Sequence, residues 1–225
     1  MKAFFIAFLA LAVSASALPQ EYEIENWEQR NLVERQIRQA IEALSAAIKD
    51  NGYDPLEVRR WAIETSPQPG IDMKVAIQDL SLKGASWIEI RRLDWSTLRS
   101  RLQLTVVLPE ISFSLGKSRF EVNVQGQKYV SEFSGTYVLS GFSIGMDVTL
   151  NIGAISGISV RSLAAEMRFS GMKSDIDMVI NQKDYSDPIN NFMNDELPRW
   201  LLVNQRAIDS ALSTALKWMA DQLLG

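Results

Sequence analysis

Residues 138–152 read VLSGFSIGMDVTLNI, and this stretch decides the fold. Its alternate positions are apolar with the single exception of Ser140, and small or polar residues lie between them from residue 143 onward. A period of two predicts a β-strand with one buried face. The strand is longer than the usual length of about five or six residues, and Gly141 and Gly145 allow it to bend sharply. The stretch therefore predicts a sheet that curls.

The same alternation continues on both sides of this stretch, from Met73 to about Ile180. The apolar parity changes between Ile77 and Leu80, which predicts a bulge. Strands that follow one another without helices between them predict an antiparallel sheet. The predicted strand residues are Met73, Val75, Ile77, Leu80 and Leu82; Leu102, Leu104, Val106 and Leu108; Ile111, Phe113 and Leu115; Phe120, Val122 and Val124; Leu163, Ala165, Met167 and Phe169; and Ile176, Met178 and Ile180.

A long amphipathic helix is predicted before the strands, from Trp27 to Lys49. Asn26 and Gln29 have the spacing of a capping box at its start, and Asn51-Gly52 is a typical stop. An apolar stripe of this kind has to be buried against another element. The stripe comprises Val33, Ile37, Ala40, Ile41, Leu44, Ala47 and Ile48.

A helical period returns after the strands, at Asp187-Pro188. Asp187 is suited to cap the helix and Pro188 to occupy its first position. Pro198 lacks an N–H donor, so it is expected to kink the helix or to start a new one. One stripe comprises Leu201, Ile208, Leu212, Leu216, Met219 and Leu223, and a neighbouring stripe comprises Trp200, Ala207, Ala211, Ala215 and Trp218. The order of helix, strands and helix indicates an α+β fold.

The N-terminus has the pattern of a cleaved secretory signal. Lys2 precedes an apolar run over residues 3–13, and an Ala-Ser-Ala exit ends at Ala17. The run is shorter than the about 20 residues that cross a bilayer; an uncleaved anchor or a buried helix is the alternative. We therefore expect residues 1–17 to be removed, residues 18–225 to form a single domain, and the protein to be secreted and extracellular, with no stable membrane insertion.

The charge and two missing residue types narrow the chemistry. The formal net charge is −4 and the isoelectric point is near 5.1, so nucleic-acid binding, which needs clustered cations, is not expected. The chain has no Cys and no His, which excludes disulfides, a thiol nucleophile, an imidazole base and the usual zinc sites. We expect no cofactor and no enzymatic activity, although a carboxylate-based enzyme or a calcium site stays open.

Several motif-like sequences have a simpler structural interpretation. Residues 141–145 match the G-x-S-x-G pattern of hydrolases, but that pattern needs a strand, a turn, a helix and a histidine, and here Ser143 lies in mid-strand. The sequence Leu115-Gly116-Lys117-Ser118 lacks the first glycine of a phosphate loop. Asp175 and Asp177 alternate with apolar residues, as on the solvent side of a strand. The simpler interpretation of six arginines is solvated charge, and the alternative is a basic patch that binds acidic lipid headgroups. These residues are Arg59, Arg60, Arg91, Arg92, Arg99 and Arg101.

Short sequences along the chain resemble one group of secreted arthropod proteins. The run Ile37-x-x-Ala40-Ile41 with Ile48, followed by Asn51-Gly52-Tyr53-Asp54-Pro55-Leu56-x-Val58, is similar to the opening of the group-seven mite allergens. The sequence Leu80-Ser81-Leu82-Lys83-Gly84, continuing through Leu108-Pro109 to Gly126 and then Ser140-Gly141, resembles the sheet region that takeout and juvenile-hormone-binding proteins share. The segment from Phe192 to Trp200 is also similar.

This resemblance implies a tubular lipid-binding fold, or super-roll, in which a highly curved antiparallel sheet wraps long helices and holds an apolar ligand. Larger relatives include bactericidal and lipopolysaccharide-binding proteins. Takeout and hormone-binding members usually carry an N-terminal cysteine pair, and this chain has none. That difference favours the allergen-like branch.

The expected function is that of a secreted carrier, which binds a lipid or another small apolar ligand in a cavity between the helices and the curved sheet. The alternative is an innate-immune recognition protein that binds amphipathic bacterial lipids or a protein partner. Transient contact with a membrane surface or a protein stays open for both. The apolar faces that lack another partner predict the cavity lining: Ile37, Ile41, Leu44, Phe142, Ile144, Met146, Ile208, Leu212, Leu216 and Met219.

Overall fold

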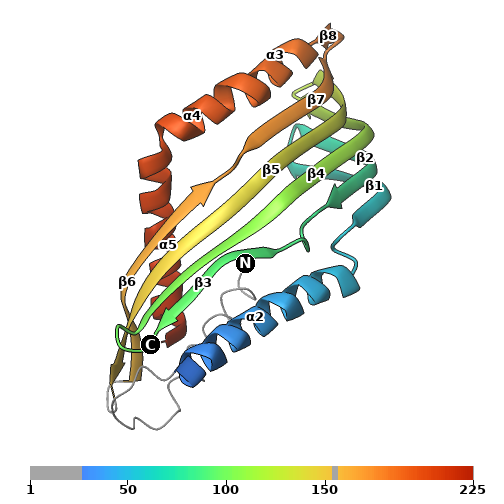
Figure 1. Cartoon of the computed structure of the whole chain (residues 1–225). Helices are drawn as coiled ribbons and strands as arrows, with labels where there is room; N and C mark the ends of the chain where they lie inside the picture. Colours follow the sequence, from blue (N-terminus) through green and yellow to red (C-terminus); the bar gives the residue numbers. More distant parts are fainter. Residues whose placement is uncertain (1–26, 154–156, 225) are drawn as a thin grey trace.

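The described strands form one curved antiparallel sheet, and helices run along its edges (Figure 1). The computed structural model describes residues 27–153 and 157–224. The predicted signal sequence and the capping residue Asn26 therefore lie outside the described residues. The predicted α+β architecture is confirmed. The strands are β1 Leu56–Gln68, β2 Ile71–Lys83, β3 Glu89–Ser96, β4 Arg101–Val124, β5 Gln127–Gly153, β6 Gly157–Arg168, β7 Gly171–Ile180 and β8 Lys183–Asp184.

The long hairpin of β4 and β5 divides the sheet into two halves. Along β4, β3 pairs first and β2 second; along β5, β7 pairs first and β6 second. The packed half consists of residues 101–108 of β4 and 142–153 of β5, with β3 and β6. The open half consists of residues 111–124 of β4 and 127–140 of β5, with β1, β2 and β7. The same two strands thus have different neighbours in each half.

The apolar positions of β5 change parity at Gly141. This residue adopts φ +59°, a backbone conformation that favours glycine, and β5 keeps its register with β4 across it. The predicted even-numbered alternation holds for residues 142–150. It is wrong before Gly141, where Val138 lies opposite Lys173 and the apolar position is Leu139. The predicted long strand is therefore present, but its apolar face moves by one residue at the kink.

The helices agree with the sequence prediction except at one cap. α2 runs from Trp27 to Asp50 and ends at the predicted Asn51-Gly52. The C-terminal helical segment consists of α3 Ser186–Asn191, the π-helical turn η1 Phe192–Glu196, α4 Leu197–Val203 and α5 Gln205–Leu224. Pro198 lies in the first turn of α4, so it starts a new helix as expected. Asp187 does not cap α3, because the helix begins one residue earlier at Ser186.

Strand β1 is not predicted by the alternation. Its residues from Arg59 to Gln68 are all exposed, so neither of its faces is marked by a run of buried apolar positions. The strand forms because its backbone pairs with β2, from Leu56 opposite Leu82 onward. The bulge predicted before Leu80 is not present as an extra residue, because β2 keeps its register with β1 and β4 across this point; the change of apolar parity coincides instead with Asp79, which has a positive φ of 47°.

Polar side chains of the helices cover the outer edges of three strands. Asn190 of α3 accepts a hydrogen bond from the Ile176 N–H of β7 and donates one to the Ile176 carbonyl group. Ser213 of α5 makes the same two contacts with Ala165 of β6, and Glu34 of α2 accepts one from the backbone of β3. These contacts satisfy edge groups that would otherwise be free to pair with another strand. They also fix each helix beside the sheet.

The buried hydrophobic core of the described residues lies in the packed half. α2 packs against β3, and α5 packs against β6. Leu104 is 1% exposed and Val148 is 3% exposed, so the two central strands are covered here. The buried cluster is Val33, Ile37, Ile41, Trp95, Leu102, Leu104, Val106, Met146, Val148, Leu150, Val160, Ala165, Leu216 and Ala220.

Candidate functional site

Residues that lie opposite one another on neighbouring strands form rows across the open half. These rows are alternately apolar and polar. One apolar row runs across five strands from β1 to β7, and the row beside it is polar throughout. Directly opposite residues of antiparallel strands point to the same face, so this half has one apolar face and one polar face. The apolar row is Leu56, Leu82, Phe113 and Tyr137, ending at Ser174; the polar row is Glu57, Ser81, Ser114, Thr136 and Asp175.

Two shorter apolar rows lie on either side of the first. One is Leu115, Gly135 and Ile176, and the other is Ile111, Leu139 and Met172. These three apolar rows are called the open rows below. They face the C-terminal helices, since the Ser174 hydroxyl at the end of the first row donates to Asn190 Oδ1 of α3 at 2.7 Å.

The open rows differ from the packed half in burial. None of their hydrophobic side chains is fully buried; each is covered only in part. Burial raises the pKa of the Tyr137 hydroxyl, and a tyrosine is neutral at physiological pH even at its ordinary pKa of about 10. The open rows thus form an uncharged surface that the described residues cover incompletely.

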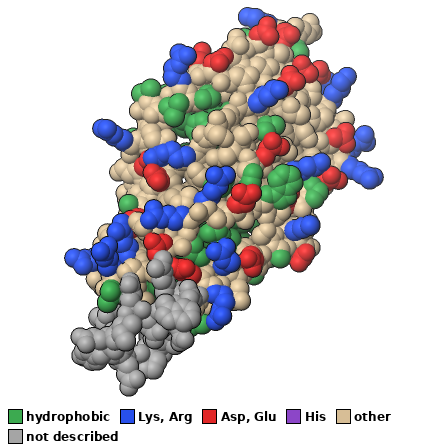
Figure 2. Space-filling model, in the orientation of Figure 1, with side chains coloured by type: hydrophobic (Ala, Val, Ile, Leu, Met, Phe, Trp, Pro, Cys, Tyr) green, Lys and Arg blue, Asp and Glu red, His purple; other side chains and the backbone are tan. Residues whose placement is uncertain are grey.

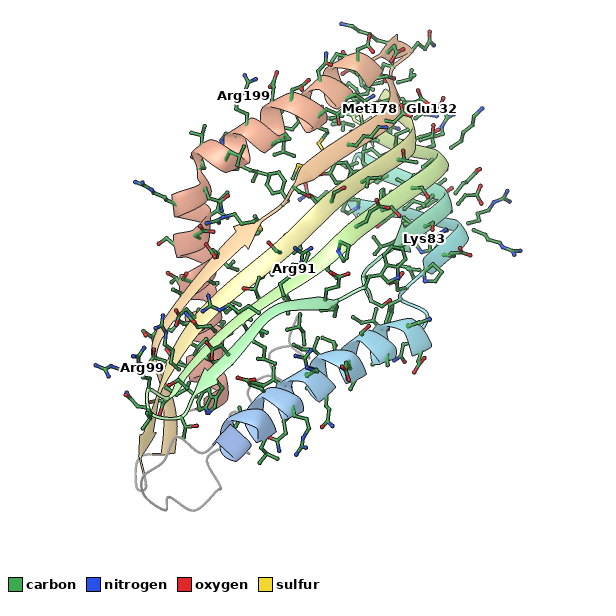
Figure 3. All side chains as sticks on the ribbon, in the orientation of Figure 1. Lys83, Arg91, Arg99, Glu132, Met178 and Arg199 are labelled. Atoms are coloured by element: carbon green, nitrogen blue, oxygen red, sulfur yellow. The ribbon has the colours of Figure 1, made fainter. Side chains whose placement is uncertain are left out.

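Helices α3 and α4 pass along the β7 side of the open half (Figure 1). Both α3 and η1 contact β7, and within the described residues neither makes an extensive contact with β2, β4 or β5. Arg199 of α4 points away from the sheet (Figure 3). Every fourth residue of the segment is apolar and half-buried: Ile189, Met193, Leu197 and Leu201. A half-buried helical stripe therefore lies beside half-buried rows of the sheet.

Gly135 leaves an unfilled position in the open rows. It lies between Leu115 and Ile176, and its φ is +132°. A Cβ atom at this position would lie 2.2 Å from the Asp175 carbonyl oxygen, so the close approach of the two backbones requires glycine. The row has no side chain at its centre as a result.

The structure places most of the predicted lining residues in the packed half. Those in the buried cluster are Ile37, Ile41, Met146 and Leu216, and those packed against it are Ile144, Leu212 and Met219. The other three, Leu44, Phe142 and Ile208, are half-buried and lie outside the cluster. Phe142 follows Gly141, so it lies where the two halves of the sheet meet. The structure therefore brings the predicted residues together mainly as one core.

Sequence reasoning missed the open rows as a candidate functional surface. Residues 111–115 alternate visibly and are predicted to form a strand. Their neighbours Tyr137 and Leu139 are concealed, because they are odd-numbered in a stretch whose even positions also read as apolar. The signal that could have found them is Gly141, since a glycine inside a long strand indicates a possible change of face.

The G-x-S-x-G residues 141–145 lie inside strand β5 and not in a strand, turn and helix. Ser143 lies opposite Val107 and Arg168, in a chain without histidine. The Arg101 guanidinium bonds to Asp147 and holds the pKa of that carboxyl below its ordinary value. This ion pair supports the interpretation of Arg101, one of the six arginines singled out in the sequence, as solvated charge. Figure 2 shows Lys, Arg, Asp and Glu side chains spread over one face of the molecule.

Two hollows in the open half are lined in part by charged side chains of both signs. One, of about 490 Å³, lies among residues that include Glu64, Lys74, Glu121 and Lys128. The other, of about 410 Å³, is lined by residues that include Glu132. Their mixed charge is poorly suited to an apolar ligand, because ligand pockets of that kind are mostly apolar.

Residues 27–153 and 157–224 contain neither a membrane-spanning helix nor a metal-binding group of acidic side chains. No helix in these ranges is long and apolar enough to cross a membrane. No group of three or more acidic side chains there is arranged to hold a metal ion.

The chain is similar to known proteins in sequence and in fold. A family model described as haemolymph juvenile hormone binding protein (JHBP) matches residues 4–225. The solved structure of takeout 1 from Epiphyas postvittana is similar over 86% of this chain and 94% of its own, with 14% identity and a TM-score of 0.39. A lipopolysaccharide binding protein is similar over 85% of this chain and 36% of its own, with 14% identity and a TM-score of 0.28. No match was found among curated proteins.

Proposed function

The chain belongs to the haemolymph juvenile hormone binding protein family, and from this premise we propose that it is a carrier that binds a lipid or another small apolar ligand against the open rows. The resemblance to takeout and juvenile-hormone-binding proteins drawn from the sequence is thereby confirmed; the allergen-like branch stays a prediction. The site of binding is our proposal, and it rests on the contrast in burial between the two halves of the sheet.

The proposal rests on one observation. The apolar face of the open half has regular rows of apolar side chains, as a core has, but these side chains are only partly buried. Phe113 and Leu82 lie side by side across neighbouring strands, as core residues do, yet both remain partly exposed. Apolar surface left in water is unfavourable by about 25 cal/mol per Å². A ligand that covered about 200 Å² of it would gain about 5 kcal/mol before the entropic costs of binding.

The ten residues predicted from the sequence take two roles in this proposal. Leu44, Phe142 and Ile208 are half-buried, and we place them at the end of the ligand site where the halves meet. The other seven belong to the core or pack against it. They lie in the packed half, beside the proposed site, and we expect them to affect binding chiefly through stability.

Titration with a fluorescent fatty-acid analogue tests the proposed function. The wild type is expected to bind saturably, and Phe113→Ala is expected to raise the Kd about tenfold, since one buried aromatic contact contributes at least 1 kcal/mol or so. Ser114→Ala is the matched control, because Ser114 belongs to the polar row beside Phe113. Its Kd should equal that of the wild type. Absence of binding by the wild type would contradict the proposal.

Salt dependence separates a carrier from a protein that recognises charged headgroups. Burial of an apolar chain is little affected by ionic strength, whereas attraction between exposed charges is screened by salt. We expect the Kd to change less than about twofold between low and physiological salt. Native mass spectrometry of detergent-free protein would then identify the mass of any ligand that copurifies.

We also propose that the protein is secreted after removal of residues 1–17. The proposal rests on the charge, apolar run and Ala-Ser-Ala exit in the sequence. N-terminal sequencing of protein from the culture medium is expected to begin at Leu18. A mature chain that begins at Met1 would contradict it.

A further inference from the structure

No described element covers the outer edge of β1, unlike the edges of β3, β6 and β7. Helix side chains bond to the backbone of those three strands. Among the described elements β1 makes its extensive contacts with β2 alone, and it lies at one side of the sheet (Figure 1). Trp61 is 46% exposed and Ile63 is 44% exposed. The free edge can therefore pair with another strand, which is the usual hazard of an uncovered edge.

The sequence of β1 is complementary to itself about Ala62. An antiparallel second copy, related by a two-fold axis through Ala62, places Trp61 opposite Ile63 of that copy. The same register places Arg60 opposite Glu64 of that copy, and the axis repeats each contact. Aromatic side chains opposite β-branched ones, and opposite charges, are cross-strand pairs that stabilise antiparallel strands.

This register is selected by two properties at once. A shift of two residues, the smallest that keeps the backbone hydrogen-bonding groups of the two strands facing each other, would place Arg60 opposite Ala62 or Ser66 and lose the charge pair. In the selected register Glu57 would face Pro67, which has no N–H to donate. Pairing is therefore confined to about residues 59–65, a segment without Pro or Gly.

We propose that two copies of this chain associate through their β1 edges, antiparallel and in this register, so that one sheet continues across the dimer. The occupant of the edge is a second copy because the charged and apolar patterns of β1 both match themselves. The proposal goes beyond ligand carriage and does not rest on it. Covalent trapping and charge exchange provide two independent tests.

Covalent trapping uses the absence of cysteine from the chain. In Ala62→Cys the axis brings the two Cβ atoms to about 5 Å, near the separation of a disulfide. Ser66→Cys is the matched control on the same strand, with its two copies about 26 Å apart at eight residue steps. Mild oxidation at micromolar concentration is expected to convert most of A62C, and little of S66C, into a disulfide-linked dimer. Equal yields from the two variants would overturn the proposal.

Charge exchange tests the register by sedimentation equilibrium. R60E places like charges opposite each other twice and is expected to raise the dimer Kd about tenfold. R60E/E64R restores the opposite charges; K74E is added because Lys74 bonds to Glu64 within the chain at 3.0 Å. The triple variant is expected to return to within about threefold of the wild-type Kd. The proposal fails if the wild type stays monomeric up to millimolar concentration, or if the triple variant dimerises as weakly as R60E.

Discussion

The packed and open halves of the sheet are built from the same two strands, β4 and β5, and they differ in what covers them. In the packed half, α2 and α5 bury a continuous cluster that includes Leu104 and Val148. In the open half the apolar rows are as regular, yet Phe113 and its neighbours remain partly exposed. Alternation therefore decides which face of a strand is apolar, and coverage by helices decides whether that face is buried core or partly exposed surface.

The largest difference between the halves is expected in stability. Leu104→Ala should lower the free energy of unfolding by about 3 to 5 kcal/mol, because the side chain is almost wholly buried and leaves a void. Leu115→Ala, the same change further along β4, should lower it by about 1 kcal/mol, because Leu115 already contacts solvent. Urea denaturation followed by circular dichroism measures both. Equal losses would remove the distinction between the halves.

The next largest effect is expected at the joint between the halves. Asp54 follows α2 and accepts hydrogen bonds from the Gly84 and Ser86 N–H groups, at 2.9 Å and 2.6 Å, and from the Ser86 hydroxyl. Asp54→Asn should lower the free energy of unfolding by about 2 to 3 kcal/mol at pH 7, because buried donors lose a charged acceptor. Ser86→Ala is the control and should lower it by about 1 kcal/mol, since both backbone donors stay bonded.

The same carboxylate gives this joint a dependence on pH. Burial raises the pKa of Asp54, but the hydrogen bonds from Ser86 and Gly84 outweigh burial, and the pKa lies below its ordinary value. The stabilisation is therefore complete above the ordinary pKa of about 4 and is lost as pH falls through the folded-state pKa. The difference in stability between the wild type and D54N should shrink below about pH 4. A difference that stayed constant to pH 2 would contradict this assignment.

Much of the fold was predictable from sequence, because its elements have clear periods. Helix α2, the long strand β5 and the new helix at Pro198 all follow from local patterns. Strand β1 does not, because it is exposed and is defined by its pairing with β2. The open rows were concealed by the change of face at Gly141, which depends on the backbone conformation of one residue. Periodicity likewise identified the core residue Ile37 as apolar but could not tell a packed face from an open one.

A smaller effect is expected when each half receives a larger side chain. Leu115→Trp should leave the free energy of unfolding within about 0.5 kcal/mol of the wild type, since its row contains Gly135 and is open to solvent. Val148→Trp should lower it by about 1 to 3 kcal/mol, because the cluster has no room for the ring. Thermal melts compare the two variants. Leu115→Trp should also weaken binding of the fatty-acid analogue, and unchanged binding would count against the proposed site.

The smallest effect is expected on the charged face of the packed half. Arg101 and Asp147 are an ion pair that is partly exposed to solvent. Arg101→Met should lower the free energy of unfolding by less than about 1 kcal/mol, and the loss should diminish at high salt. Arg99→Met is the control at a neighbouring exposed arginine. A loss above 2 kcal/mol or so would show that charge, as well as packing, holds this half together.

Photolabelling with a diazirine-bearing fatty acid tests the central claim most directly, because the label records which side chains contact the bound chain. After irradiation, digestion and mass spectrometry, we expect the adducts to concentrate in residues 111–115, 137–139 and 172–176, with excess unlabelled fatty acid suppressing them. Adducts concentrated in residues 102–106 and 146–150 would place the ligand in the packed half and contradict the account.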